Sequence, residues 1–187
     1  MDEKAYKMNK KESIIIGIDP GLQGYVCIMK YREGQRMKTF KDCTFTKMPL
    51  APRYSSRDGK IVDVRKLDTL IEKGSLIFIE ELFVGFKQSH GSIMTSSENL
   101  GRVLGLMELK ECAIHSVQPR VWQRALSERY EYEWVKGIVT KENALNLAQR
   151  IFPGEESLFE KKVPKDGLVD SILIGIYGMH LLEEHSL

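Results

Sequence analysis

The chain has few of the features that mark secreted, membrane-bound or disulfide-rich proteins. Its three cysteines, Cys27, Cys43 and Cys112, are odd in number and widely spaced, which argues against a disulfide framework or a zinc site and favours packing roles. No apolar run approaches the roughly 20 residues of a membrane span. Residues 1–12 lack the apolar core of a signal peptide. Internal repeats and low-complexity tracts are also absent from the sequence.

These absences predict a cytoplasmic protein with no membrane partner. The 187 residues are 42% hydrophobic and 29% charged, which is ordinary for a soluble globular protein. We expect residues 1–12 to be a flexible N-terminal extension. Residues 13–187 are then expected to form one domain with a sizeable core.

The chain also has little net charge, +2, but this value conceals an uneven distribution. Residues 30–66 contain eleven basic and four acidic residues, which leaves 17 basic and 22 acidic residues elsewhere. A basic segment beside an acidic pocket suits a polyanionic substrate such as nucleic acid. An ordinary solvated surface rich in lysine and arginine is the alternative interpretation of the same segment.

Acidic residues follow two short apolar runs, and two more begin a long apolar helix. Asp19 ends the run 13–18, Glu80 ends the run 76–79, and Asp166 and Asp170 lie one helical turn apart. Carboxylates are ligands for hard cations such as Mg²⁺. Two such ions about 3.5–4 Å apart can promote cleavage of a phosphodiester. Glu81 follows Glu80 but must point to the opposite face, and the apolar run does not settle which of the two faces the pocket.

Hydrophobic periodicity and turn residues predict an α/β fold. Strands are expected at 13–19, 24–31, 37–48, 76–80 and 113–117, and helices at 63–72, 97–110, 119–129, 140–151 and 166–182, with a loop at 49–60. A hairpin meander followed by alternating strands and helices implies a mixed five-stranded sheet flanked by helices. In this layout the first and fourth strands are neighbours, so Asp19 and Glu80 meet at one edge of the sheet.

Three short motifs resemble, in order and spacing, those of RuvC-like Holliday junction resolvases, and most closely the bacteriophage branch. They are GIDPG at 17–21, IEELF at 79–83 and DGLVDS at 166–171, supported by VQPRVW at 117–122 and IFP at 151–153. The resemblance implies a ribonuclease H-like fold. It also implies a homodimer that resolves branched DNA, four-way junctions above all, by paired symmetric nicks. If the chain is phage-encoded, its location is the host cytoplasm.

The resemblance further implies that Asp19, Glu80 and Asp170 are catalytic metal ligands, with Asp19 bridging two Mg²⁺ ions per active site. Mn²⁺ is expected to substitute, and no small-molecule cofactor is implied. Well-known bacterial members have an Asp or His three residues before the last Asp, where this chain has Gly167. Asp166 lies on the same helix face as Asp170, so we expect it to be the fourth ligand or a neighbouring hydrogen-bonding group.

Candidate DNA-binding residues lie in two segments, at Phe83, Phe86, Lys87, Arg120 and Arg124. The family carries an aromatic at the place of Phe83 that stacks on bases, although a core Phe under the loop is the alternative. Arg120 and Arg124 share a helix face. They could bind DNA phosphates, and ordinary solvated surface charges are an equal alternative. His90 is more often a surface residue than a ligand, and Trp122 is expected in the core.

Two further classes of function fit parts of the pattern. One is another activity on the same fold, such as a YqgF-like nuclease that acts on RNA. Sugar kinases and actin-like ATPases also begin with Gly-Ile-Asp, but they need two such domains. The other class is a non-catalytic junction-binding module. A full acidic set argues against it, because carboxylates repel phosphate in the absence of metal.

Overall fold

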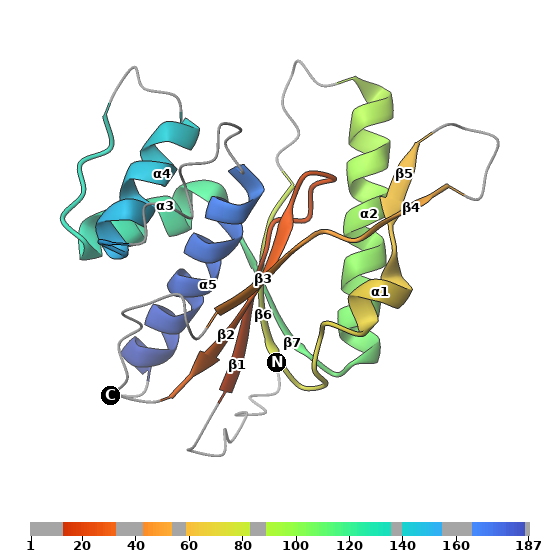
Figure 1. Cartoon of the computed structure of the whole chain (residues 1–187), viewed down its shortest axis with the longest axis horizontal. Helices are drawn as coiled ribbons and strands as arrows, with labels where there is room; N and C mark the ends of the chain where they lie inside the picture. Colours follow the sequence, from red (N-terminus) through yellow and green to blue (C-terminus); the bar gives the residue numbers. More distant parts are fainter. Residues whose placement is uncertain are drawn as a thin grey trace, which may run out of the picture.

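A five-stranded mixed sheet with helices on both faces forms the body of the protein (Figure 1). The computed structural model describes residues 13–32, 43–53, 59–82, 89–135, 140–154 and 166–185, and only the backbone at residues 140, 166 and 185. The strand order is β3-β2-β1-β6-β7. The predicted sheet and its helical layers are therefore confirmed.

The sheet combines an antiparallel meander with two parallel strands. Strand β1 (Ser13–Ile18) pairs antiparallel with β2 (Tyr25–Tyr31), which pairs antiparallel with β3 (Cys43–Lys47). On its other side β1 pairs parallel with β6 (Leu76–Glu80), which pairs parallel with β7 (Ala113–Val117). The carboxyl ends of β1 and β6 therefore lie side by side, as the sequence predicts.

Two hydrophobic cores cover the two faces of the sheet. Helices α3 (Pro119–Arg129), α4 (Thr140–Ile151) and α5 (Asp166–His185) lie on one face, and α1 (Val64–Asp68) and α2 (His90–Leu109) on the other (Figure 1). Alternate strand residues enter each core: Ile15 and Phe78 pack toward α5, whereas Ile16 and Ile77 pack toward α2. None of the helices within the described residues is long and apolar enough to cross a bilayer.

The expected loop at 49–60 is wrong in part, because its ends form a second, two-stranded sheet. Strand β4 (Leu50–Pro52) pairs antiparallel with β5 (Lys60–Val62). Contacts with α2 hold the hairpin in place. The buried Asn99 accepts the Val62 N–H at 2.9 Å, and Arg102 Nε donates to the Val62 carbonyl at 3.1 Å.

Helix boundaries differ from the predictions where capping outweighs hydrophobic pattern. Helix α2 begins at His90 and not at residue 97, because Ser89 caps it by accepting the Ser92 N–H at 3.2 Å. Helix α1 ends at Asp68, short of the expected residue 72. The buried side chain of Asn143 in α4 bonds both backbone groups of Val135.

Glycines set how closely α5 approaches the sheet. A Cβ built on Gly17 of β1 would lie 2.1 Å from the Ser171 carbonyl oxygen and 2.5 Å from the Gly175 nitrogen. These distances are shorter than any that a real Cβ makes, so only glycine fits at residue 17. Gly101 and Gly105 of α2 are different, since a Cβ on either would meet nothing within 4 Å. No other backbone therefore approaches these two glycines within the described part of the chain.

Candidate metal-binding site at the sheet edge

Asp19 and Glu80 lie together where β1 and β6 end. Ile18 pairs with Ile79 in the parallel register. Asp19 directly follows Ile18 and Glu80 directly follows Ile79, so the two acids are neighbours across the strands. Phe78, two residues before Glu80, packs in the α5 core. Because strand side chains alternate, Glu80 also points to the α5 side. Burial first, and then the negative charge of Asp19, raise the pKa of the Glu80 carboxyl.

The alternation also decides between Glu80 and Glu81. Glu80 is half-buried on the α5 side, whereas Glu81 is exposed. The backbone N–H of Glu81 donates to the Val117 carbonyl at 2.9 Å, which continues the pairing with β7 past the end of the strand. Glu80, and not Glu81, therefore lies on the face of the sheet that α5 covers, and its role as a site residue stays a prediction.

A tight glycine turn holds the carboxylate of Asp19. Its Oδ1 accepts the Gly21 N–H at 2.9 Å, and its own N–H donates to the Tyr25 carbonyl at 3.1 Å. The turn closes as the Gly24 N–H donates to the Gly21 carbonyl at 2.8 Å. A Cβ on Gly24 would lie 2.0 Å from the Asp19 carbonyl oxygen, so the turn depends on glycine there. The Pro-Gly sequence after β1 thus orients an acid and does more than reverse the chain.

The environment of Glu80 disfavours its charge. Burial is the main cause that raises the pKa of Glu80 from an ordinary 4.5 to about 7; the hydrogen bond from Trp122 opposes the rise, and the charge of Asp19 adds to it. The Trp122 Nε1–H donates to Glu80 Oε1 at 3.2 Å. Two half-buried carboxylates that repel each other are an arrangement that a cation stabilises. Trp122, predicted only as a core residue, is thus a further residue of the site.

The first turn of α5 lies against the Asp19 carboxylate. A Cβ built on Gly167 would lie 2.6 Å from Asp19 Oδ2, 2.7 Å from Gly24 Cα and 2.8 Å from the Gln23 carbonyl oxygen. This space cannot hold a side chain unless the backbone moves. It gives a physical reason for the departure from the resolvase pattern at this position, since no acid fits at residue 167.

Asp170 is half-buried on α5, three residues beyond Gly167. Residues three apart in a helix are neighbours, so Asp170 is close to the turn that touches Asp19. The side chain of Asp166 lies outside the described residues. Among the side chains that the structure describes, no three Asp, Glu, His or Cys groups converge as a metal site. The described acids at this sheet edge are therefore Asp19 and Glu80, and the ligand roles of all four acids, Asp166 and Asp170 included, remain predictions.

The candidate DNA-binding residues fall into two groups. Phe83, Phe86 and Lys87 lie outside the described residues. Arg120 and Arg124 are exposed on α3 and line an open groove of about 530 Å³. Three glutamates also line this groove, and Arg124 Nε forms an ion pair with one of them, Glu128, at 2.8 Å. This acidic lining weakens the case for Arg124 as a phosphate ligand.

Two described lysines of the basic segment 30–66 lie at opposite ends of the strands. Lys47 pairs with Tyr25, whose carbonyl accepts the Asp19 N–H, so Lys47 lies at the edge of the sheet that carries the acids. Lys30 pairs with Ile14 near the opposite edge. Both lysines are exposed. Of these two, Lys47 is therefore the one placed to meet a phosphate near Asp19.

The sheet order and the two helical layers define the ribonuclease H-like fold. The structure is similar to that of T. thermophilus RuvC in complex with Holliday junction substrate, with a TM-score of 0.51 and 15% identity over 90% of this chain and 95% of that chain. A second Thermus thermophilus RuvC structure gives a TM-score of 0.48 and 13% identity over 91% and 96% of the two chains. No protein-family model and no curated protein matches the sequence. At 15% identity the first likeness shows the fold alone.

Proposed function

We propose that the protein is a metal-dependent, structure-selective endodeoxyribonuclease of the RuvC-like type, from its bacteriophage branch. Its proposed substrate is branched DNA, with the four-way junction first. The observation that carries the proposal is the meeting of Asp19 and Glu80 at the ends of two adjacent parallel strands, under the first turn of α5. The overall fold is that of a protein solved with a Holliday junction substrate.

The described residues fit a divalent cation such as Mg²⁺ or Mn²⁺. Carboxylate oxygens are hard donors, and Mg²⁺ is commonly held by one or two carboxylates together with water and phosphate. Burial, and to a smaller extent the charge of Asp19, raise the pKa of Glu80, so a bound cation would favour its ionised form. When bound, such ions offset the charge of the phosphate and lower the pKa of water. We therefore assign Asp19 and Glu80 as ligands, with Asp170 and Asp166 as the further acids.

The chain itself contributes orientation and phosphate binding. The Gly21 N–H fixes Oδ1 of Asp19, and the exposed Lys47 at the same edge is placed to bind a DNA phosphate. Acids in this site repel a DNA strand unless cations are present. Removing one acid should therefore abolish cutting without weakening DNA binding. No residue of the site needs to form a covalent bond with DNA.

The test is Asp19→Asn, assayed on a mobile four-way junction with labels on all strands. We expect cutting in Mg²⁺ or Mn²⁺ to be abolished while junction binding persists or tightens, since one repulsive charge is removed. Glu81→Gln is the matched control, because Glu81 is adjacent to the site but exposed. Cutting by Asp19→Asn at the wild-type rate would refute the assignment.

The same substrate panel separates the rival activities. An RNA hairpin, a linear duplex, a fork and a flap are offered beside the junction. Preferential cleavage of the hairpin would favour an RNA-processing nuclease on this fold. Binding of the junction with no cleavage in either metal would favour a non-catalytic module. Paired symmetric nicks in the junction support the proposed resolvase.

Paired nicks also require two active sites, so we propose a homodimer. An isologous pair of protomers matches the two-fold symmetry of a four-way junction. Sedimentation at micromolar concentration, with and without junction DNA, should give the mass of two chains. A single chain per complex would contradict the dimer.

A further inference from the structure

We propose that Trp122 is a positioning residue that fixes the carboxylate of Glu80 for metal binding. The inference rests on the proposed function, because it assigns a role to a neighbour of a proposed ligand. Its basis is the hydrogen bond from Trp122 Nε1 to Glu80 Oε1 at 3.2 Å. The polarity of this bond is unambiguous, since an indole N–H can only donate.

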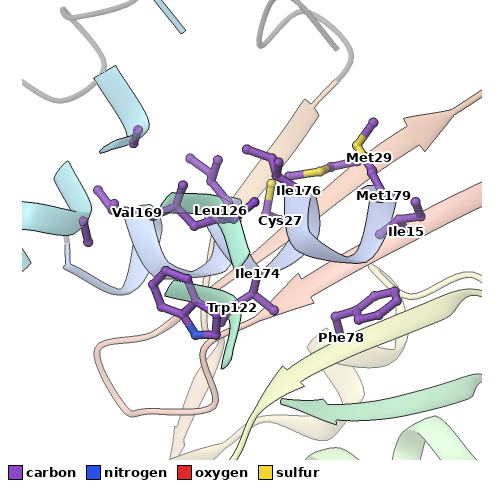
Figure 2. Packing of buried hydrophobic residues seen from close by; sticks show 14 of the residues in the cluster. Ile15, Cys27, Met29, Phe78, Trp122, Leu126, Val169, Ile174, Ile176 and Met179 are labelled. Atoms are coloured by element: carbon purple, nitrogen blue, oxygen red, sulfur yellow. The ribbon is translucent and has the colours of Figure 1, made fainter. Parts of the chain in front are cut away.

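The indole itself is held rigidly. Trp122 has no exposed surface and belongs to the core cluster between α3, α5 and the sheet. Figure 2 shows its ring among the labelled residues of that cluster, which include Leu126 from α3 and Ile174 from α5. A donor fixed by packing on all sides keeps its direction, so the oxygen that accepts from it is also fixed.

The consequence concerns how Glu80 presents its two oxygens. The indole N–H takes up Oε1, so an ion at Glu80 is expected to use Oε2. Without the donor the carboxylate gains rotational freedom and must lose it again when an ion binds. Hydrogen bonds that orient a ligand in this way commonly change metal affinity by about 10-fold to 100-fold. The hydrogen bond of Trp122 also links the start of α3 to the end of β6. These two elements come from separate sequence motifs.

A purely structural role for the tryptophan is the competing explanation, and a matched pair of variants separates the two. Trp122→Phe removes the N–H but retains an aromatic ring. Phe152→Leu also truncates a fully buried aromatic of the same cluster, which directly follows α4 and not α3. Both variants should lower the melting temperature. Only Trp122→Phe should weaken Mn²⁺ binding, by about 10-fold, as measured by titration with EPR detection of free Mn²⁺.

A second arm removes only the hydrogen-bond donor. The chain has two tryptophans, so in a Trp134→Phe background position 122 alone takes up an analogue supplied during expression. Benzothienylalanine has sulfur in place of the indole N–H and nearly the same shape. Its incorporation should reduce Mn²⁺ affinity about as much as Trp122→Phe. The normal indole in the same background should change its fluorescence on Mg²⁺ binding, and Asp19→Asn should abolish that change.

The outcomes distinguish this inference from the proposed function. If the analogue-labelled protein binds Mn²⁺ as tightly as the wild type does, the role of Trp122 is overturned and the nuclease proposal still stands. Equal losses of affinity in Trp122→Phe and Phe152→Leu would also overturn it, in favour of a structural role. Absence of any Mn²⁺ binding that depends on Asp19 in the wild type would overturn both. A selective loss in the two donor-deficient proteins supports the inference.

Discussion

The burial of Glu80 beside Asp19 should make the metal-free protein less stable as the pH rises. The pKa of Glu80 is raised from 4.5 to about 7 in the folded chain. Below pH 4.5 the group is protonated in both the folded and the unfolded chain and has no effect. Between these values the unfolded chain ionises while the folded chain retains its proton. The free energy of unfolding therefore falls through this window, by about 3 kcal/mol in total.

Glu80→Gln isolates this contribution. Glutamine retains an oxygen that can accept from Trp122 but has no charge to bury. We expect the difference in unfolding free energy between variant and wild type to grow in favour of the variant by about 2–3 kcal/mol between pH 5 and pH 8. Any fixed cost of the amide cancels in this comparison. The measurement is urea denaturation in EDTA at several pH values.

Two additions sharpen the experiment. Glu81→Gln is the matched control, since Glu81 is exposed and a change there removes the same formal charge. Addition of Mn²⁺ at pH 8 should restore stability to the wild type and not to Glu80→Gln, because a cation stabilises the ionised carboxylate. If the curves of wild type and Glu80→Gln run parallel from pH 5 to pH 8, the reasoning about this site is refuted.

Three further substitutions, two of them paired with a control substitution, test the packing and the charge around the site. Gly17→Ala should lower the free energy of unfolding by at least about 1–3 kcal/mol, because its methyl group would meet the backbone of α5. Gly101→Ala, in open space on α2, should instead raise it by about 0.5–1 kcal/mol; equal effects in urea denaturation would contradict this. Gly167→Asp should abolish the rise in melting temperature caused by Mn²⁺, and a retained rise would contradict the contact with Asp19. Lys47→Ala should reduce the log–log salt slope of junction binding by about 1, while Lys30→Ala near the far edge should not.

The main sheet was predictable because each of its strands carries a local signal. The runs that become β1 and β6 are short, β-branched and bounded by turn residues, and both are buried. The hairpin of β4 and β5 carries no such signal, since each strand has three residues and β4 contains Pro52. Its stability comes from α2, through Asn99 and Arg102. A contact between segments about 40 residues apart is not visible in a local pattern.

The acids of the site were predictable from strand ends, but their surroundings were not. Glu80 and Glu81 are equivalent in the sequence until Phe78 is known to face α5. The role of Trp122 was missed because an indole on the apolar face of an amphipathic helix is usually a core residue, and Trp122 is one as well. Only the position of its nitrogen relative to Glu80 reveals the second role.

Glycines, more than the acids themselves, set the dimensions of the site. Gly17 lets the backbone of α5 descend onto β1, and Gly167 lets the first turn of the helix reach the carboxylate of Asp19. A helix held at this depth leaves no room for a side chain at residue 167. An acid that serves the site from this turn must therefore come from a flanking position, and Asp166 is the acid that the sequence supplies there. If Asp166 is the fourth acid, as we propose, its shift by one residue relative to the resolvase pattern follows from close backbone packing at Gly167.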